Sequence, residues 1–490
     1  MSFSLPATIT VLTVSLHWCI ILGLSSRILL KRKTRGVTLS WLLIITSVPF
    51  FGAIAYLFVG ELWLPRKRIK RFSMYSPIIK QELEKLSSNW DVDQTKLHPL
   101  ASILYTQAHK SFNLPALTGN TIQIYTTTND CFQSIVNDIN NAKHSVTMLF
   151  YIWDSSGSVN AIEEALVNAA TRGIDCNVMI DSAGSARFLR SKNIQRLAAA
   201  GVEITELLPV GRFRFLFKRI DIRNHRKIIA IDQSIAYTGS MNMVDPNWFN
   251  THKRVGQWVD VMARIQGPAS ALLELLAKLD RAIEHHHNPQ TNLQTTSEPK
   301  DFPESETAHT PIQIVPSGPD QAPRVIHDML LTLIYNAESK LVITTPYFIP
   351  GESMLAALTT AALRGVDVTL VVPAKVDSKL VARASRSYFQ DLLDAGVHIQ
   401  QYNAGLLHSK TVTADNQVAM VGTVNMDKRS FWINFEVSMF IYDQESVTLI
   451  QTIQENYIQD STPIDPEEWA KHSIPSRLLD NLAQLVSPVL

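Results

Sequence analysis

Two short motifs place a histidine and a lysine at the same spacing in distant parts of the chain. Each has a lysine two residues after its histidine, an aspartate five residues after that lysine, and a Gly-Ser-x-Asn or Gly-Thr-x-Asn ending. The members are His225, Lys227, Asp232 and Asn242 in one copy and His408, Lys410, Asp415 and Asn425 in the other. Because the whole pattern occurs twice, we interpret the copies as two halves of one site.

A histidine beside a lysine is better suited to a phosphate than to a metal ion. The ammonium would repel a metal cation, whereas it neutralises a phosphoryl oxygen, and amide and backbone N–H groups add donors. If the copies face each other, one neutral imidazole attacks phosphorus and the other gives its proton to the leaving alcohol. The expected phosphate-binding side chains are Lys227, Lys410, Asn242 and Asn425. We therefore expect no metal at this site, and no nucleotide or other cofactor, since a phosphodiester exchange needs none and the chain has no Walker A pattern.

Alternating apolar residues around each His-x-Lys predict a strand that presents both side chains on one face. The apolar runs 228–231 and 411–414 would carry these strands into a core. Five residues past the lysine is too far along a strand to reach the same phosphate. Asp232 and Asp415 are therefore expected to fix loops or strand ends, although they belong to the motif.

Two further acids, Asp260 and Glu436, stand at similar places after the motifs. A carboxylate that is hydrogen-bonded to an imidazole fixes its tautomer and stabilises its cation. We expect this orienting role for both acids. A plain strand-end carboxylate remains the alternative for Asp260.

The motifs belong to a longer internal repeat. Residues 169–175 reappear at 361–367, and strands alternating with helices predict two α/β domains side by side. Gly201 and Gly396 are 195 residues apart but the histidines only 183, so 195 − 183 = 12 residues are extra in the first half. This insertion holds basic residues alternating with aromatic ones at 212–219. It indicates either a lip for anionic headgroups and acyl chains or an ordinary edge hairpin.

Two uncharged runs precede the repeat. The run 5–26 would span roughly 33 Å as a helix, and the run 37–60 contains Pro49, which bilayer helices tolerate. We therefore expect two transmembrane helices. Basic residues flank both ends of the second run, at 27–35 and 65–71, so the positive-inside rule does not fix the orientation. The first segment either forms a hairpin with the second or lies differently in the membrane, and we favour catalytic domains that face the cytoplasm. The second basic stretch would attract anionic lipid.

The chain is thus expected to consist of a few distinct segments. They are a membrane hairpin at 1–64, a basic juxtamembrane segment and helical connector at 65–120, a first domain at 121–283, a linker at 284–310 and a second domain at 311–490. The adjacent histidines 285–287 lie in the polar linker, where solvation is expected more than metal binding. Cys19, Cys131 and Cys176 have no disulfide or zinc spacing. The net charge of +1 argues against a nucleic-acid partner.

Both motifs resemble the HKD motif of the phospholipase D superfamily. The stretches 224–227, 237–242 and 422–436 resemble bacterial cardiolipin synthases in particular, with Thr423 where serine is commoner. The resemblance implies two tandem phospholipase D-like domains, related by a pseudo-twofold axis and sharing one active site. It also implies that His225 is the nucleophile, that His408 is the acid, and that the acids after the motifs support the histidines.

The resemblance further implies a phosphatidyltransferase of the bacterial inner membrane. It would join two phosphatidylglycerols into cardiolipin, releasing glycerol, with anionic phospholipids and the bilayer as partners. Hydrolysis by a phospholipase D, or transfer that uses phosphatidylethanolamine, is the nearest alternative. A nuclease and a non-catalytic membrane scaffold are the alternatives from other classes, and the oligomeric state stays open.

Overall fold

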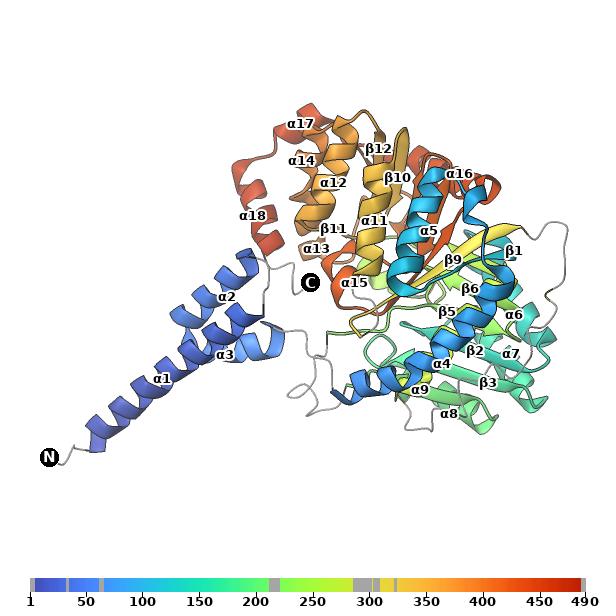
Figure 1. Ribbon diagram of the computed structural model, residues 1–490, viewed down its shortest axis with the longest axis horizontal. Helices are drawn as coiled ribbons and strands as arrows, with labels where there is room; N and C mark the ends of the chain where they lie inside the picture. Colours follow the sequence, from blue (N-terminus) through green and yellow to red (C-terminus); the bar gives the residue numbers. More distant parts are fainter. Residues whose placement is uncertain are drawn as a thin grey trace. The chain divides into compact units, whose positions relative to one another are not determined.

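The computed structural model describes residues 5–31, 35–60, 66–210, 221–284, 302, 309–320 and 324–485. The basic and aromatic insertion at 212–219, the histidines 285–287 and nearly all of the predicted linker therefore lie outside the described residues. The described residues form a helical unit before residue 65 and an α/β body that starts at Arg66 (Figure 1).

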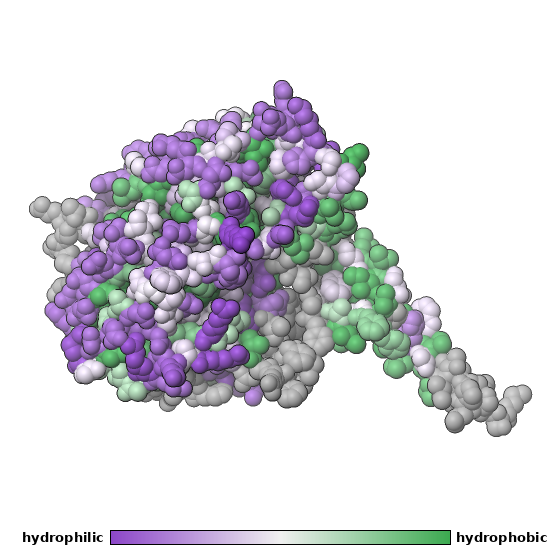
Figure 2. All heavy atoms as spheres, turned by 180° about the vertical axis from the view of Figure 1, so that it is seen from behind, coloured by the Kyte–Doolittle hydropathy of each residue, from purple (hydrophilic) through white to green (hydrophobic). Residues whose placement is uncertain are grey.

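The N-terminal unit consists of helices whose surface is largely apolar (Figure 2). They are α1 (Leu5–Leu30), α2 (Arg35–Ser47), α3 (Pro49–Ala55) and the π-helical turn η1 (Tyr56–Gly60). The stretch Leu12–Leu30 is long and apolar enough to cross a membrane, and it is the one such helix in the described part of the chain.

The prediction that residues 37–60 form one continuous transmembrane helix is wrong. The helix breaks at Val48, whose φ of −137° and ψ of 71° are not helical. The cause is Pro49, because proline offers no backbone N–H and disfavours the helical conformation in the residue before it. The apolar run becomes two short helices and a turn instead.

The α/β body is built on a 15-stranded sheet. Its first-half strands are β1 (Ala116–Tyr125), β2 (Ser145–Phe150), β3 (Asp175–Asp181), β4 (Glu203–Leu207), β5 (Ile228–Ile231), β6 (Ile235–Gly239) and β8 (Met262–Gln266). Its second-half strands are β9 (Thr310–Ser317), β10 (Lys340–Thr344), β12 (Asp367–Pro373), β13 (His398–Tyr402), β15 (Thr411–Ala414), β16 (Val418–Gly422), β18 (Glu436–Ile441) and β19 (Ser461–Pro463). Two short pairs lie apart from this sheet, namely β7 (Trp258–Val259) with β14 (Leu406–Leu407) and β11 (Phe348–Ile349) with β17 (Met426–Asp427).

The sheet has an internal symmetry that follows the repeat. Outward from β1 the order is β1-β8-β6-β5-β2-β3-β4, and outward from β9 it is β9-β18-β16-β15-β10-β12-β13. The two series match strand for strand and join where β1 and β9 pair antiparallel, with Leu117 opposite Ile312. The predicted tandem α/β class is confirmed, with one sheet running through both halves.

Helices cover both faces of this sheet, again in matching pairs. The first-half helices are α6 (Thr128–Asn141), α7 (Val159–Thr171), α8 (Lys192–Ala199) and α9 (Pro268–Glu284). The second-half helices are α11 (Val325–Asn336), α12 (Glu352–Leu363), α13 (Lys379–Arg386), α14 (Phe389–Asp394), α15 (Lys428–Trp432), α16 (Gln444–Gln459), α17 (Pro466–Ala470) and α18 (Ile474–Leu485). Leu273 of α9 and Ile450 of α16 belong to one core cluster, whereas α7 and α12 pack into the two clusters on the other side.

The predicted connector contains two helices, α4 (Arg66–Trp90) and α5 (Pro99–Phe112), before β1 begins at Ala116. Its basic start was expected to attract lipid, but Arg68 is buried. Arg68 pairs with Glu284 and, at 2.7 Å, with Asp320, and its guanidinium lies 4.5 Å from the ring centre of Phe435. A cation with two buried acid partners serves folding, so this part of the lipid-binding prediction is wrong for Arg68.

Candidate active site

Each histidine-bearing segment crosses to the opposite half of the body. The runs 228–231 and 411–414 are the predicted buried strands, β5 and β15, but regular pairing begins only after the lysines. Just before β5, the backbone N–H of His225 donates to the Phe435 carbonyl at 2.8 Å. The matching contact joins the N–H of His408 to the Val259 carbonyl, also at 2.8 Å. The prediction that His-x-Lys lies inside a strand is therefore wrong, because these residues leave the sheet to pair across the seam.

Glycine permits the closest approach at this seam. Gly256, with φ of +86°, precedes β7, and Gly405 precedes β14. A Cβ atom on Gly256 would lie 2.8 Å from the Cα of Gly405, which is too close for any side chain. The two segments can pair in parallel only because neither carries a side chain at this point.

As a result, each imidazole is held by a carboxylate from the other half. The Nδ1 of His225 lies 3.0 Å from Oε2 of Glu436, and the Nδ1 of His408 lies 2.7 Å from Oδ1 of Asp260. A carboxylate at Nδ1 keeps the proton there, so Nε2 carries the lone pair that can attack or accept a proton. The acids are where an orienting role requires them, and the exchange between halves is a feature that the sequence did not reveal.

The hydroxyl of the second motif ending supports the same arrangement. Thr423 Oγ1 donates to Oε2 of Glu436 at 2.5 Å and so fixes the acid that holds His225. The hydroxyl of the first motif ending makes a different contact, because Ser240 Oγ donates to the Val261 carbonyl at 3.2 Å, next to Asp260.

Both histidines and both motif asparagines line one cavity of about 400 Å³. Asn242 accepts from the backbone N–H of Ile152 at 3.2 Å, while its buried Nδ2 has no hydrogen-bond partner among the described residues. In Asn425 the buried atom without a hydrogen-bond partner in the described chain is Oδ1. A buried donor without a partner is costly, so Nδ2 of Asn242 marks a place for an anionic ligand oxygen.

The two motif lysines lie buried next to the histidines. Lys227 Nζ donates to the His225 carbonyl at 2.6 Å, and Lys410 makes the same bond to the His408 carbonyl. Burial lowers the pKa of Lys227 to about 8 and that of Lys410 to about 7. Because burial disfavours the charged ammonium groups, a phosphate in the cavity would stabilise them and be bound favourably in return.

The same environment affects the histidines and their acids. Burial lowers the pKa of His225, and it lowers the pKa of His408 to about 4, although the facing carboxylate opposes the shift in each case. Burial alone would raise the pKa of Asp260 and of Glu436, but the imidazole partner of each holds it below its usual value. These shifts favour neutral imidazoles and ionised acids, and a bound phosphate would favour protonation of an imidazole.

The motif aspartates lie at the far ends of β5 and β15, away from the cavity. Asp232 accepts from the backbone N–H groups of Lys143, His144 and Ser145 at 2.7–2.9 Å. Asp415 accepts from those of Glu338, Ser339 and Lys340 at 2.8–2.9 Å. Each carboxylate thereby fixes the start of the neighbouring strand, β2 or β10.

Comparison with known proteins identifies the family. Residues 135–282 and 330–458 match the family model described as cardiolipin synthase, PLD-like domain, and residues 18–61 match the phospholipase D-nuclease N-terminal model. Cardiolipin synthase A of Proteus mirabilis is 41% identical over 480 residues, covering 98% of both chains. The same enzyme of Serratia proteamaculans is 40% identical over 478 residues, covering 97% of both. The chain belongs to the cardiolipin synthase family with phospholipase D-like domains.

A solved structure agrees with the fold of this family. Phosphatidylserine synthase of Haemophilus influenzae superposes with a TM-score of 0.57 at 16% sequence identity, covering 79% of this chain and 100% of that one.

Several side chains of the cardiolipin synthase site lie outside the motif positions. Tyr151 packs edge-on against His225 with ring centres 4.9 Å apart, and Trp258 lies 4.3 Å from the ring of His408. Behind the cavity, the buried Arg226 binds both oxygens of Asp280 at 2.8 Å and so anchors the histidine segment to α9. Arg226 and Trp258 stand within or next to the quoted motifs, whereas no sequence signal singled out Tyr151.

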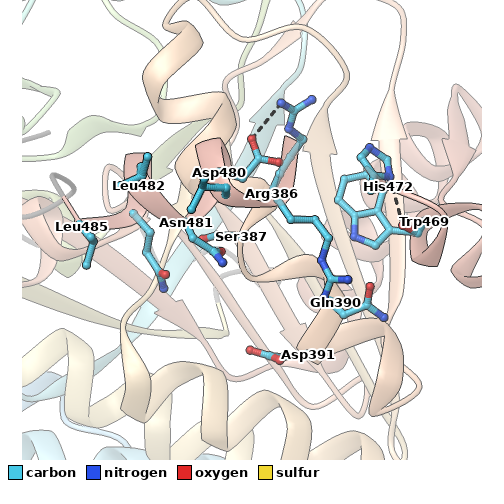
Figure 3. Close-up of a pocket in the computed structure, with 13 residues that line it drawn as sticks. Arg386, Ser387, Gln390, Asp391, Trp469, His472, Asp480, Asn481, Leu482 and Leu485 are labelled. Atoms are coloured by element: carbon cyan, nitrogen blue, oxygen red, sulfur yellow. Dashed lines mark hydrogen bonds and ion pairs between the residues drawn. The ribbon is translucent and has the colours of Figure 1, made fainter. Parts of the chain in front are cut away.

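A second hollow, of about 480 Å³, lies between α13, α14, α17 and α18 (Figure 3). Its Arg386 pairs with Asp480 at 3.1 Å, and His472 bonds the Trp469 carbonyl at 3.1 Å. Neither motif histidine lines it. Among the residues that the structure describes, no three His, Cys, Asp or Glu side chains converge as a metal site would require.

Proposed function

We propose that the protein transfers a phosphatidyl group from one phosphatidylglycerol to another, giving cardiolipin and glycerol. The observation that carries this proposal is the pair of imidazoles in one cavity, each oriented through Nδ1 by an acid of the opposite half. Similarity to cardiolipin synthases along 98% of the chain favours a lipid phosphodiester as the substrate. The same similarity disfavours simple hydrolysis.

In the first half-reaction, Nε2 of His225 attacks the phosphorus of the donor lipid. The bond from phosphorus to the glycerol oxygen breaks, and protonated His408 gives its proton to that oxygen, which leaves as glycerol. The product is a phosphatidyl group bound to His225. The geometry does not rank the two histidines, because both imidazoles are bound alike. The family resemblance therefore assigns the attack to His225.

The second half-reaction reverses these steps. His408, now neutral, accepts the proton of a hydroxyl on the second phosphatidylglycerol, whose oxygen attacks phosphorus as the bond to His225 breaks. One phosphodiester replaces another, so the reaction needs no external energy source. Glu436 stabilises the positive charge that His225 gains, and Asp260 does the same for His408.

The bound phosphate itself sets the protonation state of His408 that these two half-reactions require. Burial lowers the pKa of His408 to about 4, which favours a neutral imidazole before a phosphate binds. A lipid phosphate next to the imidazoles carries a negative charge and favours the protonated form. The acid is therefore charged mainly when a substrate is bound. Lys227, Lys410, Asn242 and Asn425 stabilise the nonbridging oxygens as charge develops.

The N-terminal unit anchors the enzyme in the bacterial inner membrane. Helix α1 is long and apolar enough to span a bilayer, whereas α2 is a shorter apolar helix. The catalytic body then works at the membrane surface, on the cytoplasmic side. This arrangement lets the headgroup enter the cavity while the acyl chains stay in lipid.

Purified full-length protein incubated with phosphatidylglycerol alone tests the proposal. Thin-layer analysis should show cardiolipin and an equal amount of released glycerol. Phosphatidic acid as the main product would show a hydrolase, and a requirement for added phosphatidylethanolamine would show a different donor or acceptor. No turnover with any of these lipids would refute the proposal.

A further inference from the structure

The cavity contains a carboxylate that phosphate chemistry does not require. Asp377 lies between β12 and α13 and lines the cavity together with both histidines. It supports neither imidazole, and the cap of α13 is Ser378. An acid close to a bound phosphate is unfavourable because like charges repel. Such a carboxylate needs a neutralising cation, and its free acceptor capacity suits a ligand group other than phosphate.

Asp377 is held in place by residues from both halves. The hydroxyl of Tyr347 donates to its Oδ1 at 2.9 Å, and Nζ of Lys253 lies 3.1 Å from its Oδ2. The Asp377 side chain is only 16% exposed. Burial raises the pKa of Tyr347 well above its usual value, so this phenol stays a donor. An ionised carboxylate accepts about four hydrogen bonds, so two of these contacts leave acceptor capacity for a ligand.

The fold does not demand an acid at this position. Strands β3 and β12 begin at Asp175 and Asp367, an offset of 367 − 175 = 192, which aligns Asp377 with residue 377 − 192 = 185. Ser185 occupies that place, where it donates to the Tyr151 carbonyl at 2.9 Å and accepts from the N–H of Trp153 at 2.9 Å. In the first half a small hydroxyl closes this loop, so loop closure does not require an acid. We therefore assign the acid of the second half to the cavity.

We propose that Asp377, positioned by Tyr347 and Lys253, forms the subsite that binds the polyol headgroup of the lipid and selects polyols over water as the acceptor. This inference rests on the proposed function. Displacement is in line, so the departing glycerol and the arriving hydroxyl occupy the same place, opposite the attacking imidazole. One subsite can serve both. Neighbouring hydroxyls of glycerol can donate to one carboxylate together, whereas water or a simple alcohol offers one group.

Lys253 makes the acid compatible with anionic lipids. Its ammonium neutralises Asp377 at a distance of 3.1 Å, so the cavity gains a hydroxyl acceptor without a net negative charge. Tyr347 and Lys253 come from opposite halves, and the subsite is complete only when the halves are assembled. We classify Asp377 as a binding residue and the other two as positioning residues, since no proton transfer is assigned to them.

The test compares two free acceptors in full-length protein reconstituted with phosphatidylglycerol. Radiolabelled glycerol and radiolabelled 1-propanol are supplied at equal concentrations, and incorporation of each label into lipid is measured together with phosphatidic acid. In Asp377→Asn we expect the preference for glycerol over 1-propanol to fall by about 10-fold or more, through KM for glycerol more than through kcat. The ratio of phosphatidic acid to cardiolipin should rise. Tyr347→Phe, which keeps the ring, should change both ratios in the same direction by less.

Asp367→Asn is the matched control, because it removes a carboxylate at the other end of β12. Its ratios should equal those of the unaltered protein. If Asp377→Asn and Tyr347→Phe melt at the unaltered temperature yet keep the original glycerol preference, the subsite is refuted and the proposed function stands. If Asp377→Asn does not fold, Tyr347→Phe alone decides between these outcomes. If the unaltered protein makes neither cardiolipin nor glycerol exchange products, the proposed function fails and this inference fails with it.

Discussion

The two halves of the α/β body share one strand order but surround their histidines with different chemistry. Around His225 the cavity wall contains Arg223 of the first half and Arg429 of the second, near Tyr151, whose pKa is raised by burial although both arginines oppose the shift. The second half contributes Asp377 and Tyr347 to the same cavity. Within one symmetric scaffold, the backbone and the motifs are duplicated while the cavity wall is not.

This difference shows how a duplicated site can carry out an asymmetric reaction. The shared parts are the imidazole, the buried lysine and the crossed acid, which any phosphoryl transfer through histidine needs. Attack, protonation and acceptor binding require different neighbours, and these come from positions that the repeat leaves free to vary. Variants at matching positions therefore test which features of the two halves are equivalent.

The largest expected effect comes from removing either imidazole. His225→Ala and His408→Ala should each lower cardiolipin synthesis by about 10⁴-fold or more, because the two act as one unit. The halves should differ in covalent labelling, which can be measured with radiolabelled phosphatidylglycerol and electrophoresis. His408→Ala should still form the phosphatidyl-enzyme, whereas His225→Ala should not.

If both variants were labelled equally, the assignment of His225 as nucleophile and His408 as acid would be refuted. Labelling of His225→Ala alone would exchange the roles, with His408 as the nucleophile. His252→Ala is a suitable control, since this histidine follows the first motif but lies outside the cavity lining. It should label and turn over like the unaltered protein.

The motif asparagines should be unequal although the motifs match. Asn242→Ala removes a buried donor that has no partner among the described residues, so kcat should fall by about 10²–10³-fold. The buried atom of Asn425 without a partner among the described residues is the acceptor Oδ1 and not a donor, so Asn425→Ala should lower kcat by less. Initial rates at saturating phosphatidylglycerol measure both. A larger loss at Asn425 would place the principal oxyanion contact in the second half.

The crossed acids should affect opposite limbs of the pH profile of kcat. Asp260 raises the pKa of His408 against the lowering effect of burial, so Asp260→Asn should lower this pKa and move the alkaline limb to lower pH by about 1–3 units. Glu436 has the same effect on His225, whose neutral form attacks. Glu436→Gln should therefore move the acid limb to lower pH. If both variants move the same limb, the assignment of acid and nucleophile is wrong.

Local patterns in the sequence predicted the chemistry and the fold class, because spacing and alternation are properties of neighbouring residues. The runs 228–231 and 411–414 are buried strands as expected, and both histidines share one cavity. The crossed pairing was not predictable. His408 meets Asp260 through the pairing of β7 with β14, which are far apart in the chain, and no local period records such contacts.

The errors have the same origin. Arg68 looked like one cation among several in a basic stretch, but its partners Glu284 and Asp320 are remote in sequence. The break at Val48 was underestimated because tolerance of proline in a bilayer does not ensure a continuous helix. Asp377 belongs to no motif and stands in a loop, so only the assembled cavity reveals it.

Replacing the motif aspartates is expected to have the smallest effect on turnover. The effect should also be the most similar between the two halves. Asp232→Ala and Asp415→Ala each leave three backbone N–H groups without their carboxylate partner at the start of β2 or β10. Each should reduce the unfolding free energy by about 1–3 kcal/mol, measured by denaturant titration, with a smaller change in kcat per folded molecule. Similar losses would show that this pair is a duplicated structural device. A loss of kcat without a loss of stability in either variant would instead place that aspartate in the chemistry and extend the asymmetry to the motif itself.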